Sequence, residues 1–127
     1  MKIKTINLEE VEEIGDGFLM RNEDLAEINL AKVRHIGTCF LYYNYGVREI
    51  KLPSLVSAND CFLAHNRHMR SVNLPELVSV GMCFLYSILR PTELKLPKLN
   101  RAGGDLFVCC YVLEAVAIRT QVEAALK

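Results

Sequence analysis

The fold is decided by the stretch VREIKLPSLVSANDCFLAHN at residues 47–66, which returns as MRSVNLPELVSVGMCFLYSI at residues 69–88. The two copies stand 22 residues apart, and the same interval separates a row of apolar residues: Ile6, Ile28, Ile50, Val72, Leu94 and Val116. No insertion breaks this register. A fixed period of this length is typical of stacked repeats, in which each unit buries its apolar face against its neighbours. The sequence therefore predicts a solenoid.

The first half of each unit alternates apolar and polar residues. Ile50-Lys51-Leu52 and Leu94-Lys95-Leu96 each place one polar residue between two apolar ones. A period of two predicts a β-strand with one face buried and the other in water. Strands of neighbouring coils would stack in parallel at about 4.8 Å into one continuous sheet. We expect six such strands, the outermost containing Asn7 and Ala117.

The second half of each unit predicts a turn and then a core. Proline follows the strand at Pro53, Pro75 and Pro97, and since it cannot donate to a ladder, the chain should leave the sheet there. A row of glycine or asparagine then predicts a corner at positive φ: Gly15, Gly37, Asn59, Gly81 and Gly103. Large core residues follow: Phe18, Phe40, Phe62, Phe84 and Leu106.

Two further rows are interpreted as structural. Asn22, Asn44 and Asn66 share one repeat position, where a buried amide can satisfy backbone groups that no strand ladder reaches. Cys39, Cys61 and Cys83 share another, beside the core phenylalanines. A cysteine in such a place behaves as a small buried hydrophobe.

This frame resembles the leucine-rich repeat, most closely the bacterial BspA-type unit, which carries Ile-Pro, Ile-Gly and Ala-Phe in that order. The equivalents here are Leu52-Pro53, Ile36-Gly37 and Cys39-Phe40, and the resemblance runs from about Ile6 to Ile118. This chain departs from the family in having a unit one residue shorter, and in having asparagine where the family has a cysteine after the phenylalanine.

The resemblance implies an α/β-type repeat solenoid. It would be a right-handed coil with a parallel β-sheet on the concave face and a loop-rich or short-helical convex side. It also implies protein or glycan partners and no catalytic residues. We expect a single domain over residues 1–127, with five repeats from about residue 6 to 115. A final strand and a short capping helix would follow over 116–127, with Val122 and Leu126 facing the last coil.

Composition narrows the class of function. Lys and Arg total 15, as do Asp and Glu, so the formal net charge is zero, which argues against a nucleic-acid binder. The longest apolar runs, such as Leu106–Leu113, fall far short of the roughly 20 residues that span a bilayer. Residues 1–6 show no signal-peptide core, and five cysteines make an odd count, so we expect a reducing, cytoplasmic compartment. Secretion is the alternative if the chain is a trimmed fragment or an effector.

The sequence contains no recognisable catalytic or cofactor chemistry. No nucleophile has a paired base, and Ala102-Gly103-Gly104-Asp105 lacks the lysine and serine of a P-loop. Cys61, His65 and His68 lack a convincing fourth ligand for zinc, and stacked cysteines would lie along a line rather than around a centre. We therefore predict no metal, no cofactor and no enzymatic activity.

Two surfaces could instead recognise a partner. The concave face would present Thr5, Asn7, Glu27, Asn29, Glu49, Lys51, Ser71, Asn73, Glu93 and Lys95. The loop side would present Tyr42, Tyr43, Tyr45, His65, Arg67, His68 and Tyr86, rich in the residue types of interface hot spots. The resemblance favours a protein-interaction scaffold that uses the concave face. An adhesion fragment of a larger secreted protein, a host-targeted bacterial effector, and a homodimer through the uncapped N-terminal end stay open as alternatives.

Overall fold

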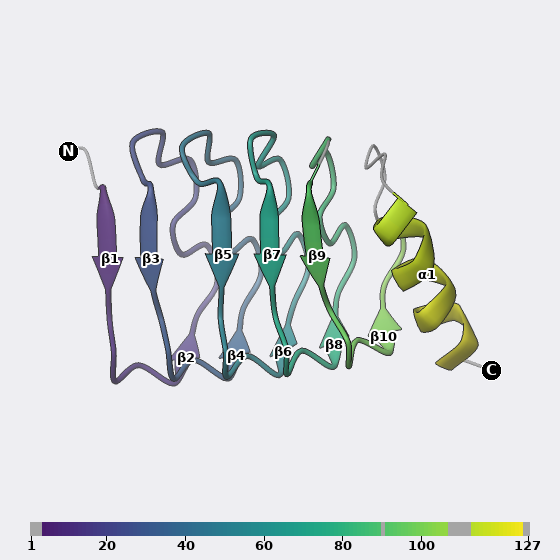
Figure 1. Cartoon of the computed structure of the whole chain (residues 1–127). Helices are drawn as coiled ribbons and strands as arrows, with labels where there is room; N and C mark the ends of the chain where they lie inside the picture. Colours follow the sequence, from purple (N-terminus) through teal and green to yellow (C-terminus); the bar gives the residue numbers. More distant parts are fainter. Residues whose placement is uncertain (1–3, 90, 107–112, 126–127) are drawn as a thin grey trace.

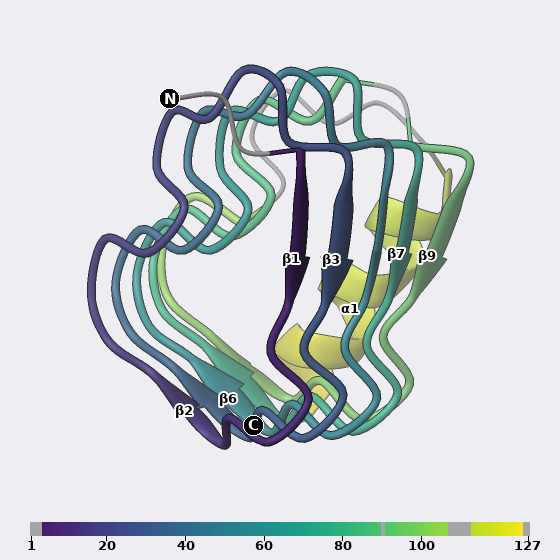
Figure 2. The same cartoon turned by 90° about the vertical axis from the view of Figure 1, so that its left-hand side faces the viewer.

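The computed structural model describes residues 4–89, 91–106 and 113–125, and it shows a right-handed solenoid of stacked parallel strands closed by one helix (Figure 1). Figure 2 looks along the axis from the N-terminal end, and the chain winds clockwise as it recedes from the viewer. Long strands form one side of each coil: β1 (Thr5–Asn7), β3 (Glu27–Asn29), β5 (Glu49–Lys51), β7 (Ser71–Asn73) and β9 (Glu93–Lys95). Short strands form another: β2 (Glu13–Ile14), β4 (His35–Ile36), β6 (Ser57–Ala58), β8 (Ser79–Val80) and β10 (Arg101–Ala102).

The long strands confirm the alternation predicted from the sequence. In β5 and β9 the central Ile50 and Leu94 are buried, whereas the residues on either side are exposed. Neighbouring strands pair in parallel with a register of one repeat, so Ile50 stands beside Val72 and Val72 beside Leu94. The ladder joins β1 to β3 and, separately, β5 to β7 and β9. Figure 1 shows β3 and β5 further apart than the other neighbours. Three-residue strands share few bonds, so a small displacement of one coil is enough to interrupt the sheet.

The short strands form a second parallel sheet, in the order β10-β8-β6-β4-β2, that the sequence did not predict. Its inward residues Ile14, Ile36, Ala58 and Val80 are buried. Each strand is only two residues long, which is too short to display a period of two. Repetition along the axis, rather than the length of any strand, makes this ladder stable.

A third side of the coil is hydrogen-bonded without being a strand. In each of the first four coils three alternate residues have φ between 53° and 73°, among them Cys39, Leu41 and Tyr43. Their N–H groups donate in alternating directions: Cys39 to Asp60 O of the next coil (2.8 Å), Leu41 to Phe18 O of the previous one (3.1 Å) and Tyr43 to Ala64 O (3.0 Å). A left-handed backbone costs a non-glycine residue roughly 1–2 kcal/mol. Bonds to both neighbouring coils offset that cost.

The predicted positive-φ corner at the glycine row was wrong. Among the described glycines only Gly17, which lies outside that row, has a positive φ, of 73°. A Cβ added at Gly37 would lie 2.8 Å from the backbone nitrogen of Asp16, and one at Gly81 would lie 2.7 Å from that of Asp60. Glycine is required in these coils because the preceding coil passes too close for a side chain.

The core confirms the predicted aromatic and asparagine rows. The rings of Phe18, Phe40, Phe62 and Phe84 stack along the axis with centroids 6.3, 5.8 and 5.6 Å apart. Asn66 is fully buried, and its Nδ2 donates to Leu41 O (2.6 Å), Leu63 O (3.0 Å) and Ala64 O (3.3 Å). Asn44 repeats the arrangement with Leu19 O at 2.8 Å, and its Oδ1 accepts from the Asn22 N–H at 2.9 Å.

The C-terminal end corrects the prediction of a final strand at 116–117. Helix α1 (Leu113–Ala125) already spans these residues, because the segment is rich in the helix formers alanine, leucine, glutamate, arginine and glutamine. The predicted cap is therefore present, but it begins earlier. Ile118 and Val122 are buried against the last coil, and Gln121 Nε2 donates to Leu99 O at 2.7 Å. Leu126, which the sequence placed in the cap, lies outside the described residues.

The N-terminal coil is less covered. Ile6, Val11 and Phe18 are only half-buried, although their equivalents in the third coil, Ile50, Leu55 and Phe62, are buried. Leu8 and Met20 are exposed at the same end. Among the described residues there is no helix long and apolar enough to cross a membrane.

Candidate functional site

The outer surface of the five long strands, here called the long-strand face, carries every residue predicted for the concave face. One row contains Thr5, Glu27, Glu49, Ser71 and Glu93, and a second contains Asn7, Asn29, Lys51, Asn73 and Lys95. Pairing in register puts Glu49 beside Ser71 and Ser71 beside Glu93, and likewise joins Lys51, Asn73 and Lys95. Ser71 and Asn73 are half-buried and the others exposed.

Charges on the long-strand face are arranged in two unlike rows. The first row is acidic through Glu27, Glu49 and Glu93, whereas the second contains lysines and asparagines. The only ion pair that the described residues make on this face joins Lys95 Nζ to Glu93 Oε1 at 3.4 Å. Both side chains are about half exposed, at 60% and 48%, so the pair is weak and can exchange for a partner's groups.

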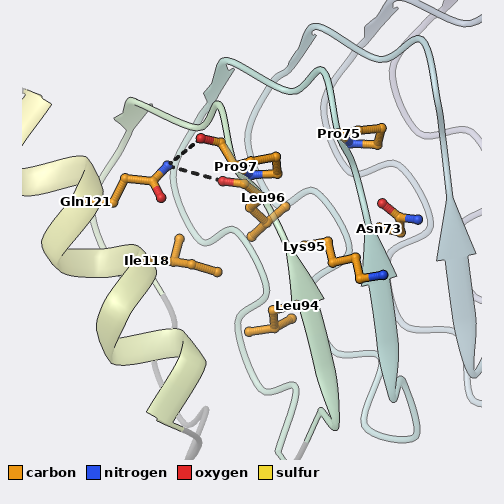
Figure 3. Close-up of a pocket in the computed structure, with 8 residues that line it drawn as sticks. All are labelled: Asn73, Pro75, Leu94, Lys95, Leu96, Pro97, Ile118 and Gln121. Carbon is orange, nitrogen blue, oxygen red and sulfur yellow. Dashed lines mark hydrogen bonds between the residues drawn. The ribbon is translucent and has the colours of Figure 1, made fainter.

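An apolar hollow closes the C-terminal end of this face, between β9 and α1 (Figure 3). Its volume is about 350 Å³, and it is lined by Asn73, Pro75, Leu94, Lys95, Leu96, Pro97, Ile118 and Gln121. In Figure 3 the Gln121 amide points to the carbonyls of Leu96 and Pro97, which it meets at 3.2 and 3.3 Å. Lys95 of β9 and Asn73 of β7 line the part of the hollow that adjoins the long strands. The hollow thus joins an apolar floor to polar groups of the predicted site.

The loop patch, defined as Tyr42, Tyr43, Tyr45, His65, Arg67, His68 and Tyr86, is brought together as a cluster of rings. His65 is its centre, with ring centroids 4.9 Å from Tyr43, and 5.2 Å from both Tyr42 and Tyr86. Tyr45 adjoins Tyr43 at 5.6 Å and His68 at 6.5 Å. Arg21, which the sequence did not single out, places its guanidinium carbon 5.5 Å from the Tyr43 ring centroid.

Burial alters the protonation of the loop patch. The His65 ring is half-buried, and both burial and the nearby Arg67 charge lower its pKa. Burial, followed by the neighbouring Cys61 and Cys39 thiols, raises the pKa of Tyr42. Burial and a hydrogen bond with Tyr43 raise that of Tyr45. Each of these three shifts favours the neutral form of the side chain concerned.

The three cysteines of one repeat position lie on neighbouring coils. Cys39, Cys61 and Cys83 are free and half-buried. Burial and the neighbouring Cys39 and Cys83 raise the pKa of Cys61 to about 11, so its reactive thiolate is scarce at neutral pH. In the part of the chain that the structure describes, no group of three or more His, Cys, Asp and Glu is placed to hold a metal ion.

Sequence reasoning missed the residues that complete both surfaces. Arg21 stands one repeat before Tyr43, so the 22-residue interval alone could have identified it. Ile118 and Gln121 could not have been found in this way, because the packing of α1 against β9 does not follow the repeat.

Comparison with family models, with curated proteins and with solved structures finds no match to this chain.

Proposed function

We propose that this chain is a non-catalytic scaffold, a bacterial leucine-rich repeat of BspA type, that binds a protein segment along the long-strand face. The observation that carries the proposal is the pair of polar rows on five stacked strands, leading into the apolar hollow at α1. Polar side chains that repeat at a fixed interval suit an extended partner, and an adjoining apolar hollow provides an anchor for one large side chain.

The geometry also suggests how the partner would lie. On the usual spacing of stacked strands the face is on the order of 20 Å long, enough for a segment of six or so extended residues. Glu27 and Glu49 would meet basic groups, while Lys51 and Lys95 would meet acidic ones. An apolar side chain of the partner would enter the hollow against Leu94, Leu96 and Ile118.

The loop patch supports a second candidate surface for the same class of function. Its rings offer a large, rigid and partly polar contact area around His65. Tyrosine and arginine contribute strongly to binding when they are desolvated. The free thiols of Cys39, Cys61 and Cys83 are consistent with a reducing, cytoplasmic compartment, which we include in the proposal.

The test is affinity capture from the source organism's lysate with two matched variants. In the first, Glu49, Lys51, Glu93 and Lys95 of the long-strand face are changed to alanine. The second changes Glu12, Glu13, Arg34 and Arg101, which are exposed near or on the short strands and carry the same two acidic and two basic charges. Both variants should retain the wild-type unfolding transition.

A partner captured by the wild type and the second variant, but lost by the first, would support binding on the long-strand face. A partner kept by both variants would transfer the proposal to the loop patch. Turnover of a substrate by the pure protein, abolished by a single substitution, would overturn the non-catalytic assignment.

A further inference from the structure

A second hollow lies beyond the long-strand face, where the chain enters β7 and β9 from the loop side. It has a volume of about 530 Å³ and is lined by Tyr45, Arg67, His68, Met69, Arg70, Leu89 and Thr92. We call it the basic hollow. Three residues of the loop patch contribute to it, but Met69, Arg70, Leu89 and Thr92 do not belong to either predicted surface. It is separate from the apolar hollow at α1, with which it shares no lining residue.

The charge of the basic hollow is not compensated. Arg67 and Arg70 are both exposed, and neither forms an ion pair with any other described residue. Among the described residues, no acidic side chain lines the hollow. Glu23 is close enough to Tyr45 to act on its ionisation, but it stands one repeat before Tyr45, whereas Arg67 stands one repeat after. The lining therefore presents two permanent positive charges to solvent.

The same hollow has an apolar component. Leu89 is 39% exposed and Tyr45 37% exposed, whereas Met69 is fully buried. The Tyr45 ring meets His68 edge-on with centroids 6.5 Å apart. The Thr92 hydroxyl donates to Arg70 O at 3.2 Å, and the Thr92 N–H donates to the same oxygen at 2.7 Å, which fixes the Arg70 backbone.

We propose that the basic hollow binds an acidic peptide segment in which an aromatic or aliphatic side chain stands between carboxylates. Arg67 and Arg70 pair with the carboxylates in charge-assisted, bidentate geometry, and Tyr45 and Leu89 cover the apolar side chain. A peptide fits better than a nucleic acid, because the chain has no net positive charge and the cations occupy one hollow rather than a long track. This binding does not depend on the long-strand face.

The test uses the full chain labelled with ¹⁵N and two blocked hexapeptides, Glu-Glu-Leu-Phe-Glu-Glu and its glutamine counterpart Gln-Gln-Leu-Phe-Gln-Gln. Binding of the acidic peptide should shift the amide signals of Tyr45, His68, Leu89 and Thr92. The double variant Arg67→Gln and Arg70→Gln should weaken binding at least tenfold, and the lysine double variant should restore part of it. The control double variant Arg34→Gln and Arg101→Gln removes the same charge elsewhere and should bind like the wild type.

Several results would overturn the proposal. Equal binding of the glutamine peptide would show that charge is not recognised, and equal weakening by the control variant would show a non-specific effect of net charge. Shifts caused by inorganic phosphate or a single-stranded oligonucleotide, with none caused by the acidic peptide, would reassign the hollow to phosphate groups. A negative result in this test would not bear on the proposal for the long-strand face. That proposal is tested by a separate four-alanine variant, which changes no residue that lines the basic hollow.

Discussion

Gly37 and Gly81 have to be glycine because the backbone of the preceding coil passes close to them. A Cβ at either position would press on the backbone nitrogen of the preceding coil. We expect Gly37→Ala to lower the free energy of unfolding by about 1–3 kcal/mol, as overpacking does. Gly15 occupies the same repeat position, but a Cβ there would meet nothing within 4 Å. Gly15→Ala should therefore change stability by no more than about 0.5 kcal/mol in urea unfolding. Equal losses would contradict the role assigned to close approach.

The buried asparagine side chains provide hydrogen bonds to backbone carbonyls that no strand ladder reaches. Asn66→Ala leaves the carbonyls of Leu41 and Leu63 without this donor. Each buried group that loses its partner costs about 1–3 kcal/mol, so we expect a loss of about 2–4 kcal/mol. Asn22 is only half-buried, and its side-chain Nδ2 donates to Met20 O, so Asn22→Ala should cost about 1 kcal/mol. Denaturant unfolding of both variants measures the contrast, and a smaller loss at Asn66 than at Asn22 would refute it.

The ring of His65 gives the fold a dependence on pH. Its pKa in the folded chain is lowered from the ordinary value of 6.5, first by burial and then by Arg67. The unfolded chain therefore binds the proton more tightly, so stability is complete above about pH 6.5 and falls as the pH drops below it.

Urea unfolding at pH 7.5 and pH 5 measures this dependence. Between these two pH values the wild type should lose more stability than His65→Phe, which cannot be protonated. The same pH dependence in wild type and His65→Phe would disprove the assignment.

Helix α1 caps the last coil. Ile118 is 7% exposed and Val116, on the same helix, is 61% exposed. We expect Ile118→Ala to lower the free energy of unfolding by about 2–4 kcal/mol through loss of packing. Val116→Ala removes apolar atoms from a side chain that is mostly in water, and should change it by no more than about 0.5 kcal/mol. Thermal unfolding of the two variants is the measurement. A large effect at Val116 would mean that α1 packs through another face.

Elements with a repeating signal could be predicted from sequence, and elements without one could not. The long strands, the phenylalanine stack and the asparagine row all recur every 22 residues and lie where the period places them. The short strands could not be predicted because a strand of two residues shows no alternation. The left-handed backbone at Leu41 and Tyr43 could not be predicted because no glycine marks these positions. Both features arise from hydrogen bonds between coils, which a single unit does not reveal.

The same division applies to the candidate site. Glu27, Glu49, Lys51 and Lys95 could be placed on one face because alternation within a strand and repetition between strands fix their direction. The aromatic side chains around His65 could be predicted to lie together because they occupy the same loop of neighbouring coils. The hollow beside Ile118 depends on a helix outside the repeat, so no periodicity could have predicted it.

For the molecule as a whole, stacking brings equivalent residues of successive repeats together on one surface. Neighbouring coils are hydrogen-bonded on three sides, except between β3 and β5, where the long-strand pairing is interrupted, so residues 22 positions apart lie side by side along the axis. Two exposed ion pairs follow the same interval, Lys32 with Glu10 at 2.9 Å and Lys98 with Glu76 at 2.7 Å. Exposed pairs of this kind add little stability, so the backbone ladders and the stacked core hold the coils together.

The most direct test of the proposed function is carboxyl footprinting of the complex with the captured partner. Carbodiimide-driven labelling, read by mass spectrometry, reports the exposure of each carboxylate with and without the partner. Binding along the long-strand face predicts at least threefold slower labelling of Glu27, Glu49 and Glu93, with Glu12 and Glu13 unchanged. Unchanged labelling of those three glutamates, together with slower labelling of Glu23 beside Tyr45, would contradict the proposal and place the partner on the loop patch.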